Sequence, residues 1–193
     1  MRLWLGILLV PALAVAAPRT RAADPKKQAI EQAARGDAWA VANRCDEAVK
    51  AYRQSLALQP KNPLVQVRLA HCLAQGKVAN GAAEAKQILT ALAGESGSTG
   101  LLALQELGDL ALQSGDFAGA VDAYDKLLAK APTNLDARLA LLDALKGLSD
   151  AGDEKARARG MELAQKLKTE PRADAGQQRH AEELVAMFQY GDA

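Results

Sequence analysis

Apolar residues recur at intervals of three and four along most of this chain, the spacing that places side chains on one face of an α-helix. The pattern is clearest over residues 117–131, where the apolar positions are Phe117, Ala120, Val121, Tyr124, Leu127 and Leu128. Residues 177–189 repeat it, with apolar positions at Ala181, Leu184, Val185 and Phe188. The pattern predicts a series of amphipathic helices, each of which needs a partner to cover its apolar face.

The chain also resembles itself at a fixed distance. Four residues recur 72 positions later, Gly36 as Gly108, Ala48 as Ala120, Tyr52 as Tyr124 and Pro60 as Pro132. Looser copies of the same segment begin near Leu69 and at Leu135. Such self-similarity is typical of repeat proteins, in which stacked copies of one supersecondary unit bury a continuous core.

The repeated segment resembles the tetratricopeptide repeat, a helix–turn–helix unit of 34 residues. The resemblance rests on the apolar–small pairs Leu69-Ala70 and Leu107-Gly108, the turn Gly115-Asp116-Phe117, the small Ala48 and Ala120, the aromatic Tyr52 and Tyr124, and the helix-ending Pro60 and Pro132. It implies an all-α, right-handed superhelical solenoid of about four helix pairs, with residues 173–193 as a C-terminal capping helix.

On this resemblance, the chain divides into repeats at 29–62, 63–100, 101–134 and 135–172. The second and fourth copies depart from the pattern, with longer turns at 77–81 and 149–153. Residues 95–100 are rich in Gly and Ser, which predicts a slightly long loop between repeats, with a hinge between two halves as the alternative.

The N-terminal segment has the composition of a secretory signal. A basic residue at position 2 precedes an apolar run over 3–17 that ends in small residues. We expect residues 1–16 to be removed, with a cut as late as Ala22 as the alternative, and residues 17–28 to form a linker. An uncleaved anchor is the other interpretation, but the run is shorter than the roughly 20 residues that span a bilayer. We therefore expect an exported bacterial protein, periplasmic or secreted, without a stable membrane span after cleavage.

Composition agrees with the helical pattern, and the charge balance excludes one class of partner. The chain has 42 Ala and 29 Leu but only 4% aromatic residues, a mixture that favours helix over strand. Its 24 basic residues nearly balance its 23 acidic ones, giving a net charge of +1. This balance argues against nucleic acid as a partner.

The only two cysteines are Cys45 and Cys72. In the stacking that the resemblance implies, Cys45 lies at the turn of the first repeat and Cys72 late in the first helix of the next. An exported protein meets an oxidising compartment, so one interpretation is a disulfide between them. The other is a pair of small buried thiols in helix-packing positions. No Cys-x-x-Cys motif supports a catalytic redox pair.

The resemblance also implies a binding surface. In tetratricopeptide proteins, the first helix of each repeat lines a concave groove that often holds an extended or helical segment of a partner protein. Carried over position by position, the groove residues are Asp37, Ala40, Val41, Val67, His71, Ala74, Gln75, Gln105, Asp109, Leu112, Gln113, Leu139, Asp143 and Lys146.

Four of these residues, Asp37, His71, Asp109 and Asp143, occupy equivalent places and form one column along the groove. A metal or acid–base site is the sharpest interpretation of this column. Neighbouring helices pack about 8–10 Å apart, too far for these side chains to share one ion. We therefore expect no metal site. A hydrogen-bonding stripe for a partner and an ordinary solvated face are the remaining alternatives.

Catalytic motifs are missing from the sequence. It has no Gly-rich phosphate loop, nucleophile elbow or His-Glu-x-x-His helix, so we expect neither enzymatic activity nor a cofactor. The sequence predicts a non-enzymatic adaptor in an envelope or secretion assembly, with another protein as its partner. Two alternatives stay open: a structural subunit that self-associates through the solenoid ends, forming a homo-oligomer, and a regulatory module of a cell-wall enzyme.

Overall fold

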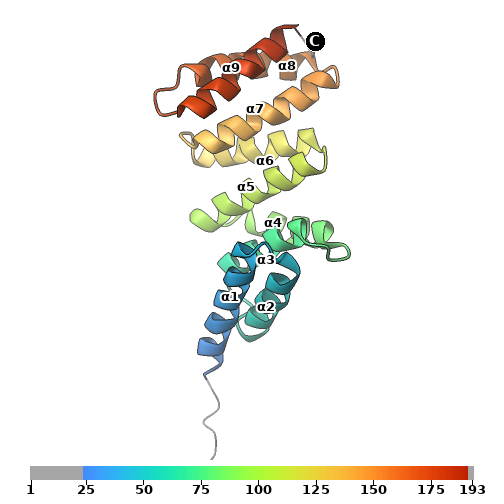
Figure 1. The fold of residues 1–193 in the computed structure, drawn as a ribbon, viewed down its shortest axis with the longest axis vertical. Helices are drawn as coiled ribbons and strands as arrows, with labels where there is room; N and C mark the ends of the chain where they lie inside the picture. The colour runs from blue at the N-terminus through green and yellow to red at the C-terminus, as the bar shows by residue number, and fades with distance from the viewer. Residues whose placement is uncertain (1–23, 191–193) are drawn as a thin grey trace, which may run out of the picture.

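The computed structural model describes residues 24–190, which form nine α-helices and no β-strand (Figure 1). The helices are α1 (Pro25–Val41), α2 (Cys45–Leu58), α3 (Pro63–Gln75), α4 (Gly81–Leu92), α5 (Ser98–Gln113), α6 (Phe117–Lys130), α7 (Leu135–Asp150), α8 (Glu154–Lys168) and α9 (Ala175–Tyr190). The expected signal at 1–16, the first part of the expected linker at 17–28, and residues 191–193 lie outside the described residues. None of these nine helices is long and apolar enough to cross a membrane.

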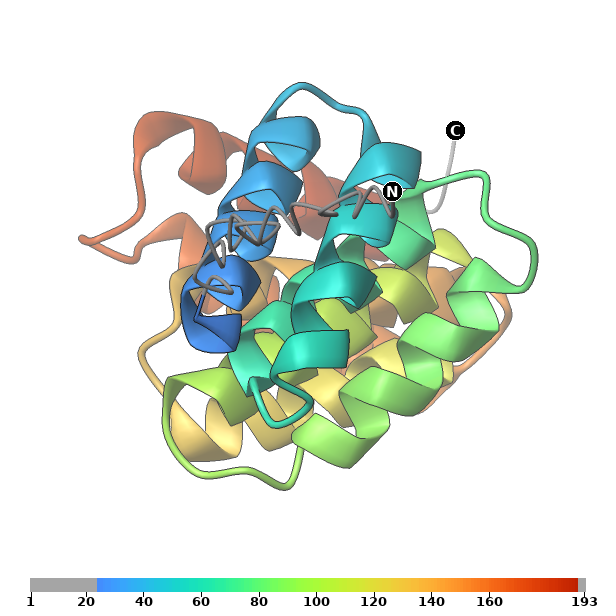
Figure 2. The ribbon, with the colours of Figure 1, turned by 90° about the horizontal axis from the view of Figure 1, so that it is seen from below.

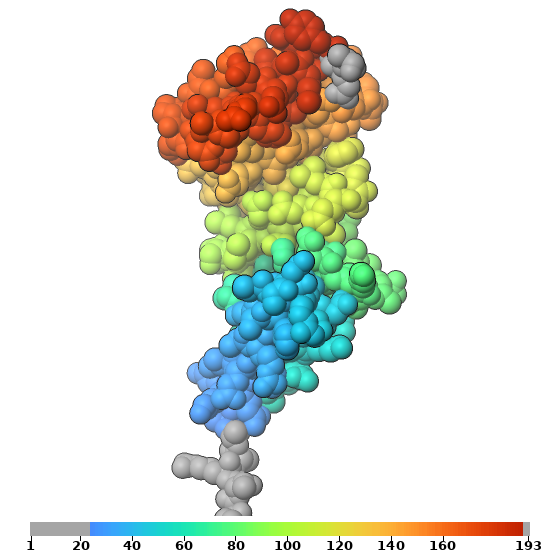
Figure 3. All heavy atoms as spheres, viewed as in Figure 1, coloured from blue at the N-terminus to red at the C-terminus, as the bar shows by residue number. Residues whose placement is uncertain are grey.

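The helices form four helix–turn–helix pairs that stack in chain order, and α9 covers the last pair by packing against α7 and α8 (Figure 1). Seen from the N-terminal end, the pairs behind α1 and α2 are turned relative to them (Figure 2). The space-filling view shows an elongated stack that runs from the blue N-terminal end to the red C-terminal end (Figure 3). The expected all-α solenoid with a terminal capping helix is confirmed.

Side chains at the helix ends explain where the helices begin. Six capping side chains accept hydrogen bonds from N–H groups of the first turn that have no partner inside the helix, namely Asp24, Asn62, Asp116, Asn134, Asp153 and Asp174. Helix α1 begins four residues before the expected repeat start at 29, because Asp24 caps it and Pro25 suits the first helical position. Helices α2 and α6 end just before Pro60 and Pro132.

Two glycines allow the paired helices of the first and third repeats to approach closely. Tyr52 and Tyr124 are 1% and 0% exposed. A Cβ atom at Gly36 would lie 2.5 Å from the Tyr52 ring, and one at Gly108 would lie 2.5 Å from the Tyr124 ring. The glycine and the tyrosine therefore recur together because each ring packs directly against helix backbone.

The buried apolar residues form two clusters that meet at α5. The N-terminal cluster extends from Ala48 to Leu110, and the C-terminal cluster extends from Leu104 to Phe188. Helix α5 contributes to both, since Ala103 and Leu110 face the first and Leu104 and Ala111 face the second. One helix thus forms a wall of both cores.

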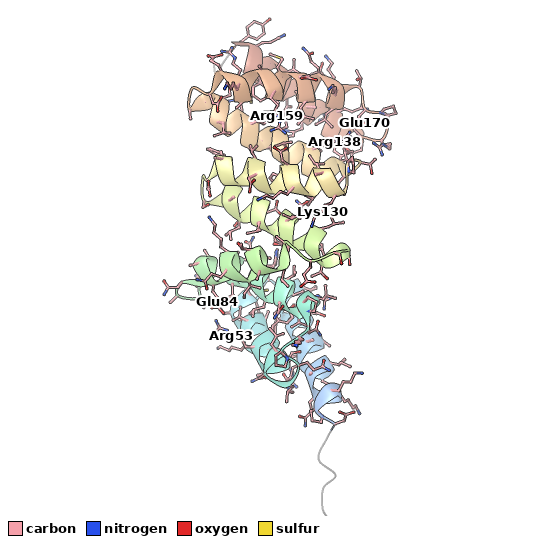
Figure 4. The ribbon with its side chains drawn as sticks, turned by 180° about the vertical axis from the view of Figure 1, so that it is seen from behind. Arg53, Glu84, Lys130, Arg138, Arg159 and Glu170 are labelled. Atoms are coloured by element: carbon pink, nitrogen blue, oxygen red, sulfur yellow. The ribbon has the colours of Figure 1, made fainter. Side chains whose placement is uncertain are left out.

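Ion pairs connect the second helices of successive repeats, and Figure 4 labels Arg53, Glu84 and Arg159, which take part in them. They join α2 to α4, α4 to α6, and α6 to α8, through Arg53 with Glu84 at 2.6 Å, Lys86 with Asp116 at 3.5 Å, and Arg159 with Asp125 at 2.9 Å. Exposed pairs of this kind contribute about 0–1 kcal/mol each. These ion pairs therefore add little stability, but each one connects side chains of two successive repeats.

The segment for which a loop or a hinge was expected is a short loop at 93–97, because α5 already begins at Ser98. The Lys130 ammonium group donates to the carbonyl oxygen of Ala93 at 3.2 Å and to that of Glu95 at 3.5 Å. This lysine comes from α6, so the third repeat holds the loop that leads into it.

Candidate binding groove

The first helices of the first three repeats, α1, α3 and α5, line a cavity of about 470 Å³. It is bounded by Asp37, Ala40, Val41, Tyr52, Leu64, Val67, Arg68, His71, Cys72, Leu102 and Glu106. We call this cavity the groove. Five of the fourteen groove residues expected from the sequence line it, namely Asp37, Ala40, Val41, Val67 and His71.

The groove carries aliphatic side chains that the protein's own core does not cover. Val41, Leu64 and Leu102 are 90%, 41% and 42% exposed, and they come from three successive first helices. Val67 beneath them is 4% exposed. Covering such apolar surface releases about 25 cal/mol for each Å² removed from water, so these positions favour an apolar ligand.

The polar side of the groove in the first repeat is centred on Asp37. The Tyr52 hydroxyl donates to Asp37 Oδ1 at 2.9 Å, and the Arg68 guanidinium contacts both carboxylate oxygens at 2.8 and 3.1 Å. Burial of the phenol is the larger cause of a raised pKa of Tyr52, and its hydrogen bond to Asp37 is the second cause. Asp37 therefore joins α1, α2 and α3.

A second charged pair crosses the groove between α3 and α5. His71 Nδ1 lies 2.9 Å from Glu106 Oε2. The hydrogen bond to Glu106 raises the pKa of His71, since the carboxylate stabilises the protonated imidazole. The groove thus has an apolar floor between an Asp–Arg ion pair and a His–Glu contact.

In the third repeat, Asp109 accepts the same tyrosine hydrogen bond as Asp37. The Tyr124 hydroxyl donates to Asp109 Oδ1 at 2.6 Å, and Gln105 Nε2 donates to the same atom at 3.2 Å. Burial of the phenol raises the pKa of Tyr124. The Gly–Asp pair and the tyrosine of this repeat therefore form one structural unit.

The remaining residues expected in the groove lie along the rest of the stack. Asp143 is 2.9 Å from His180 of α9, and Lys146 pairs with Asp150. Leu112 and Leu139 pack on the C-terminal core, and Ala74 packs on the N-terminal one. Gln75 lines a different cavity near the turn after α1, and Gln113 is exposed at the end of α5.

The four residues of the expected column do not form one site, because each has its own partner. They are Asp37, His71, Asp109 and Asp143. Each of the four contacts a different residue, and three of these contacts join the first helices of neighbouring units. Within residues 24–190, no three His, Cys, Asp or Glu side chains are grouped to hold a metal ion. The column thus contributes to the packing of the repeats.

Six groove residues were missed from the sequence, namely Tyr52, Leu64, Arg68, Cys72, Leu102 and Glu106. A signal for the two leucines was present, because each is the second residue of an expected repeat, at 63–100 and 101–134. The two charged residues also share one repeat position, the sixth of 63–100 and of 101–134, but they carry opposite charges, and the same position holds Ala34 and Ala140 in the other repeats.

A second cavity of about 340 Å³ lies between the third and fourth repeats. It contains the basic residues Arg138, Arg159 and Lys166. Their partners are Glu170 at 3.3 Å, Asp125 at 2.9 Å and Glu162 at 2.6 Å. Because acidic side chains already neutralise these cations, this cavity is a weaker candidate than the groove.

Comparison with known proteins agrees with this architecture. The tetratricopeptide-repeat family model matches residues 101–134, which comprise α5, α6 and the flanking turns. A solved structure of a MamA mutant superposes with a TM-score of 0.58 at 17% identity, over 88% of this chain and 100% of that one. No curated protein matches the chain. The repeat and the solenoid are thus shown by independent comparisons.

Proposed function

We propose that this tetratricopeptide-repeat protein is a non-enzymatic adaptor whose groove binds an apolar segment of a partner protein. Proteins of this type generally serve as scaffolds for protein interactions. One observation carries the proposal: Val41, Leu64 and Leu102 are exposed along a single cavity. A segment with two or three aliphatic side chains on one face would cover them, as in other helix-in-groove complexes.

The two charged pairs support a partner of low net charge. Asp37 and Arg68 neutralise each other beside the apolar floor, and Glu106 contacts His71 on the other side. A strongly acidic or basic segment would meet a like charge at one of these pairs, which costs binding free energy.

We place this adaptor in a bacterial envelope or secretion assembly. The support is the apolar run at 3–17, which has the length and composition of a secretory signal. N-terminal sequencing of the protein purified from its host tests this setting. A start between residues 17 and 23 is expected, and a mature chain that begins at Met1 would contradict it.

Crosslinking in the native host, followed by mass spectrometry, tests the groove. Leu64→Glu and Leu102→Glu place charges on the apolar floor, and we expect each to abolish the crosslink to the partner. Leu58→Glu is the matched control, because Leu58 on α2 is 38% exposed but does not line the groove. Equal partner capture by all three variants, with unchanged circular dichroism, would refute the proposal.

Self-association through the open N-terminal end is a second candidate. Ile30 and Val41 are 58% and 90% exposed, and their spacing places them on the same side of α1. Light scattering after size exclusion tests it. A stable oligomer that Ile30→Glu dissociates would favour this candidate, whereas a monomer at all concentrations would exclude it.

A further inference from the structure

Two sulfur atoms meet where the first and second repeats pack together. Cys45 is the first residue of α2, and Cys72 lies in the last turn of α3. Their Sγ atoms are 3.1 Å apart, although the residues are separated by 27 positions in the sequence. Cys72 is 0% exposed, whereas Cys45 is partly accessible.

The backbone around the two sulfur atoms is held in place by other contacts. Asp46 Oδ1 accepts a hydrogen bond from the backbone N–H of Lys77 at 2.9 Å, which ties the start of α2 to the end of α3. Gly76 has no side chain at this contact, and a Cβ atom there would lie 2.8 Å from Asp46 Oδ1 and 3.5 Å from Cys45 Cβ. The two thiols therefore face each other across a fixed and closely packed junction.

We propose that Cys45 and Cys72 form an intramolecular disulfide that joins α2 to α3 and makes the first two repeats one covalent unit. A disulfide requires the two cysteines to be close before the bond forms, and this junction meets that requirement in the folded chain. The proposal concerns the junction alone and does not depend on what the groove binds.

The bond forms by exchange with an external disulfide, such as an oxidised thiol–disulfide oxidoreductase or oxidised glutathione. The Cys45 thiolate attacks one sulfur of this oxidant and releases its other sulfur as a thiolate. Cys72 then loses its proton and attacks Cys45 Sγ, which releases the second oxidant thiolate. Two protein thiols lose two electrons and two protons, and the external disulfide is reduced to two thiols.

The environment of the two thiols assigns this order of events. Cys45 is the one that an oxidant reaches from solvent, since Cys72 is fully buried. Burial raises the pKa of the Cys72 thiol to about 12, and its hydrogen bond with Cys45 adds to this effect. Closure by Cys72 requires its thiolate and therefore becomes faster as pH rises.

Thiol counting on the wild-type chain tests the proposal without a variant. The reduced, folded protein is incubated with oxidised glutathione, unfolded, and treated with a maleimide before its intact mass is measured. We expect no maleimide on the oxidised chain, a mass lower by two hydrogen atoms, and two maleimides on the reduced control. Two maleimides on both samples, a lasting glutathione adduct or a disulfide-linked dimer would overturn the proposal.

Two variants test the roles of the individual cysteines. Cys72→Ala should retain a glutathione adduct at Cys45, because the second attack is missing. Cys45→Ala should stay unmodified while it is folded, because Cys72 is buried. An adduct on Cys72 of the folded protein would contradict the assigned order. The oxidised wild type should also unfold at a higher temperature than the reduced form, and an unchanged temperature would contradict the stapling of the two repeats.

Discussion

The contact between Gly108 and Tyr124 predicts that a single added methyl group destabilises the protein. In Gly108→Ala, the new Cβ atom would lie 2.5 Å from two atoms of the Tyr124 ring, whereas carbon atoms normally pack about 3.5–4.0 Å apart. The ring has little room to move, because it is fully buried and its hydroxyl is bonded to Asp109. Helices α5 and α6 must therefore separate by about 1 Å.

The expected magnitude is the difference between two opposing effects. Overpacking a well-packed core costs about 1–3 kcal/mol, and replacing glycine by alanine inside a helix recovers up to about 1 kcal/mol. We therefore expect Gly108→Ala to lower the free energy of unfolding by about 1–2 kcal/mol. Gly36→Ala should have a similar effect, since its Cβ atom would lie 2.5 Å from the Tyr52 ring.

Urea denaturation followed by far-UV circular dichroism measures this change. Gly94→Ala, in the loop at 93–97, is the control for an added methyl group that meets nothing, because a Cβ atom there would have no neighbour within 4 Å, and we expect little or no loss of stability. In a Tyr124→Phe background the buried ring remains but loses its bond to Asp109, so Gly108→Ala should still be destabilising, at most as much as in the wild type. In a Tyr124→Leu background it should cost less. A stabilising Gly108→Ala, or an equal cost in the leucine background, would refute the steric argument.

Three further predictions concern hydrogen bonds. Tyr124→Phe removes the donor to Asp109 and should cost about 1.5 kcal/mol in urea denaturation, and an unchanged midpoint would show that this hydrogen bond contributes nothing. The bond to Glu106 raises the pKa of His71, so its stabilisation is fully present below the unfolded pKa and is lost as pH rises through the folded pKa. The urea midpoint of the wild type should therefore fall more between pH 6 and 8 than that of His71→Gln, and parallel curves would contradict this. Asn134→Ala removes the cap of α7 and should cost about 1 kcal/mol by the same assay, whereas a neutral effect would argue against capping.

The repeat architecture could be predicted from the sequence because it depends on local and periodic features. The glycine and tyrosine pairs, 72 residues apart, mark the close helix contacts, and the capping residues and prolines mark the helix ends. The start of α1 was missed because residues 25–28 belong to no repeat, and their helix depends on the cap at Asp24.

The details of the groove could be predicted only in part. Helical periodicity identifies the face of each first helix, which brought Asp37, Val67 and His71 to the cavity. It does not identify the partner across the groove. Asp37 pairs with a residue 31 positions later, His71 with one 35 positions later, and Asp143 with one 37 positions later. Because these intervals differ, the pairing depends on turn length and on the rotation between repeats.

The position of α5 between the two cores has a consequence for cooperativity. Nearest-neighbour arrays can lose their end repeats one at a time, since each repeat contacts only its neighbours. Here, unfolding of α5 with either half would also expose the core of the other half. The reason is that Leu104 and Leu110 lie on one helix but belong to different cores. The amide protons of α5 should therefore exchange with solvent only when the whole chain unfolds, whereas those of α1 and α9 exchange through local fraying.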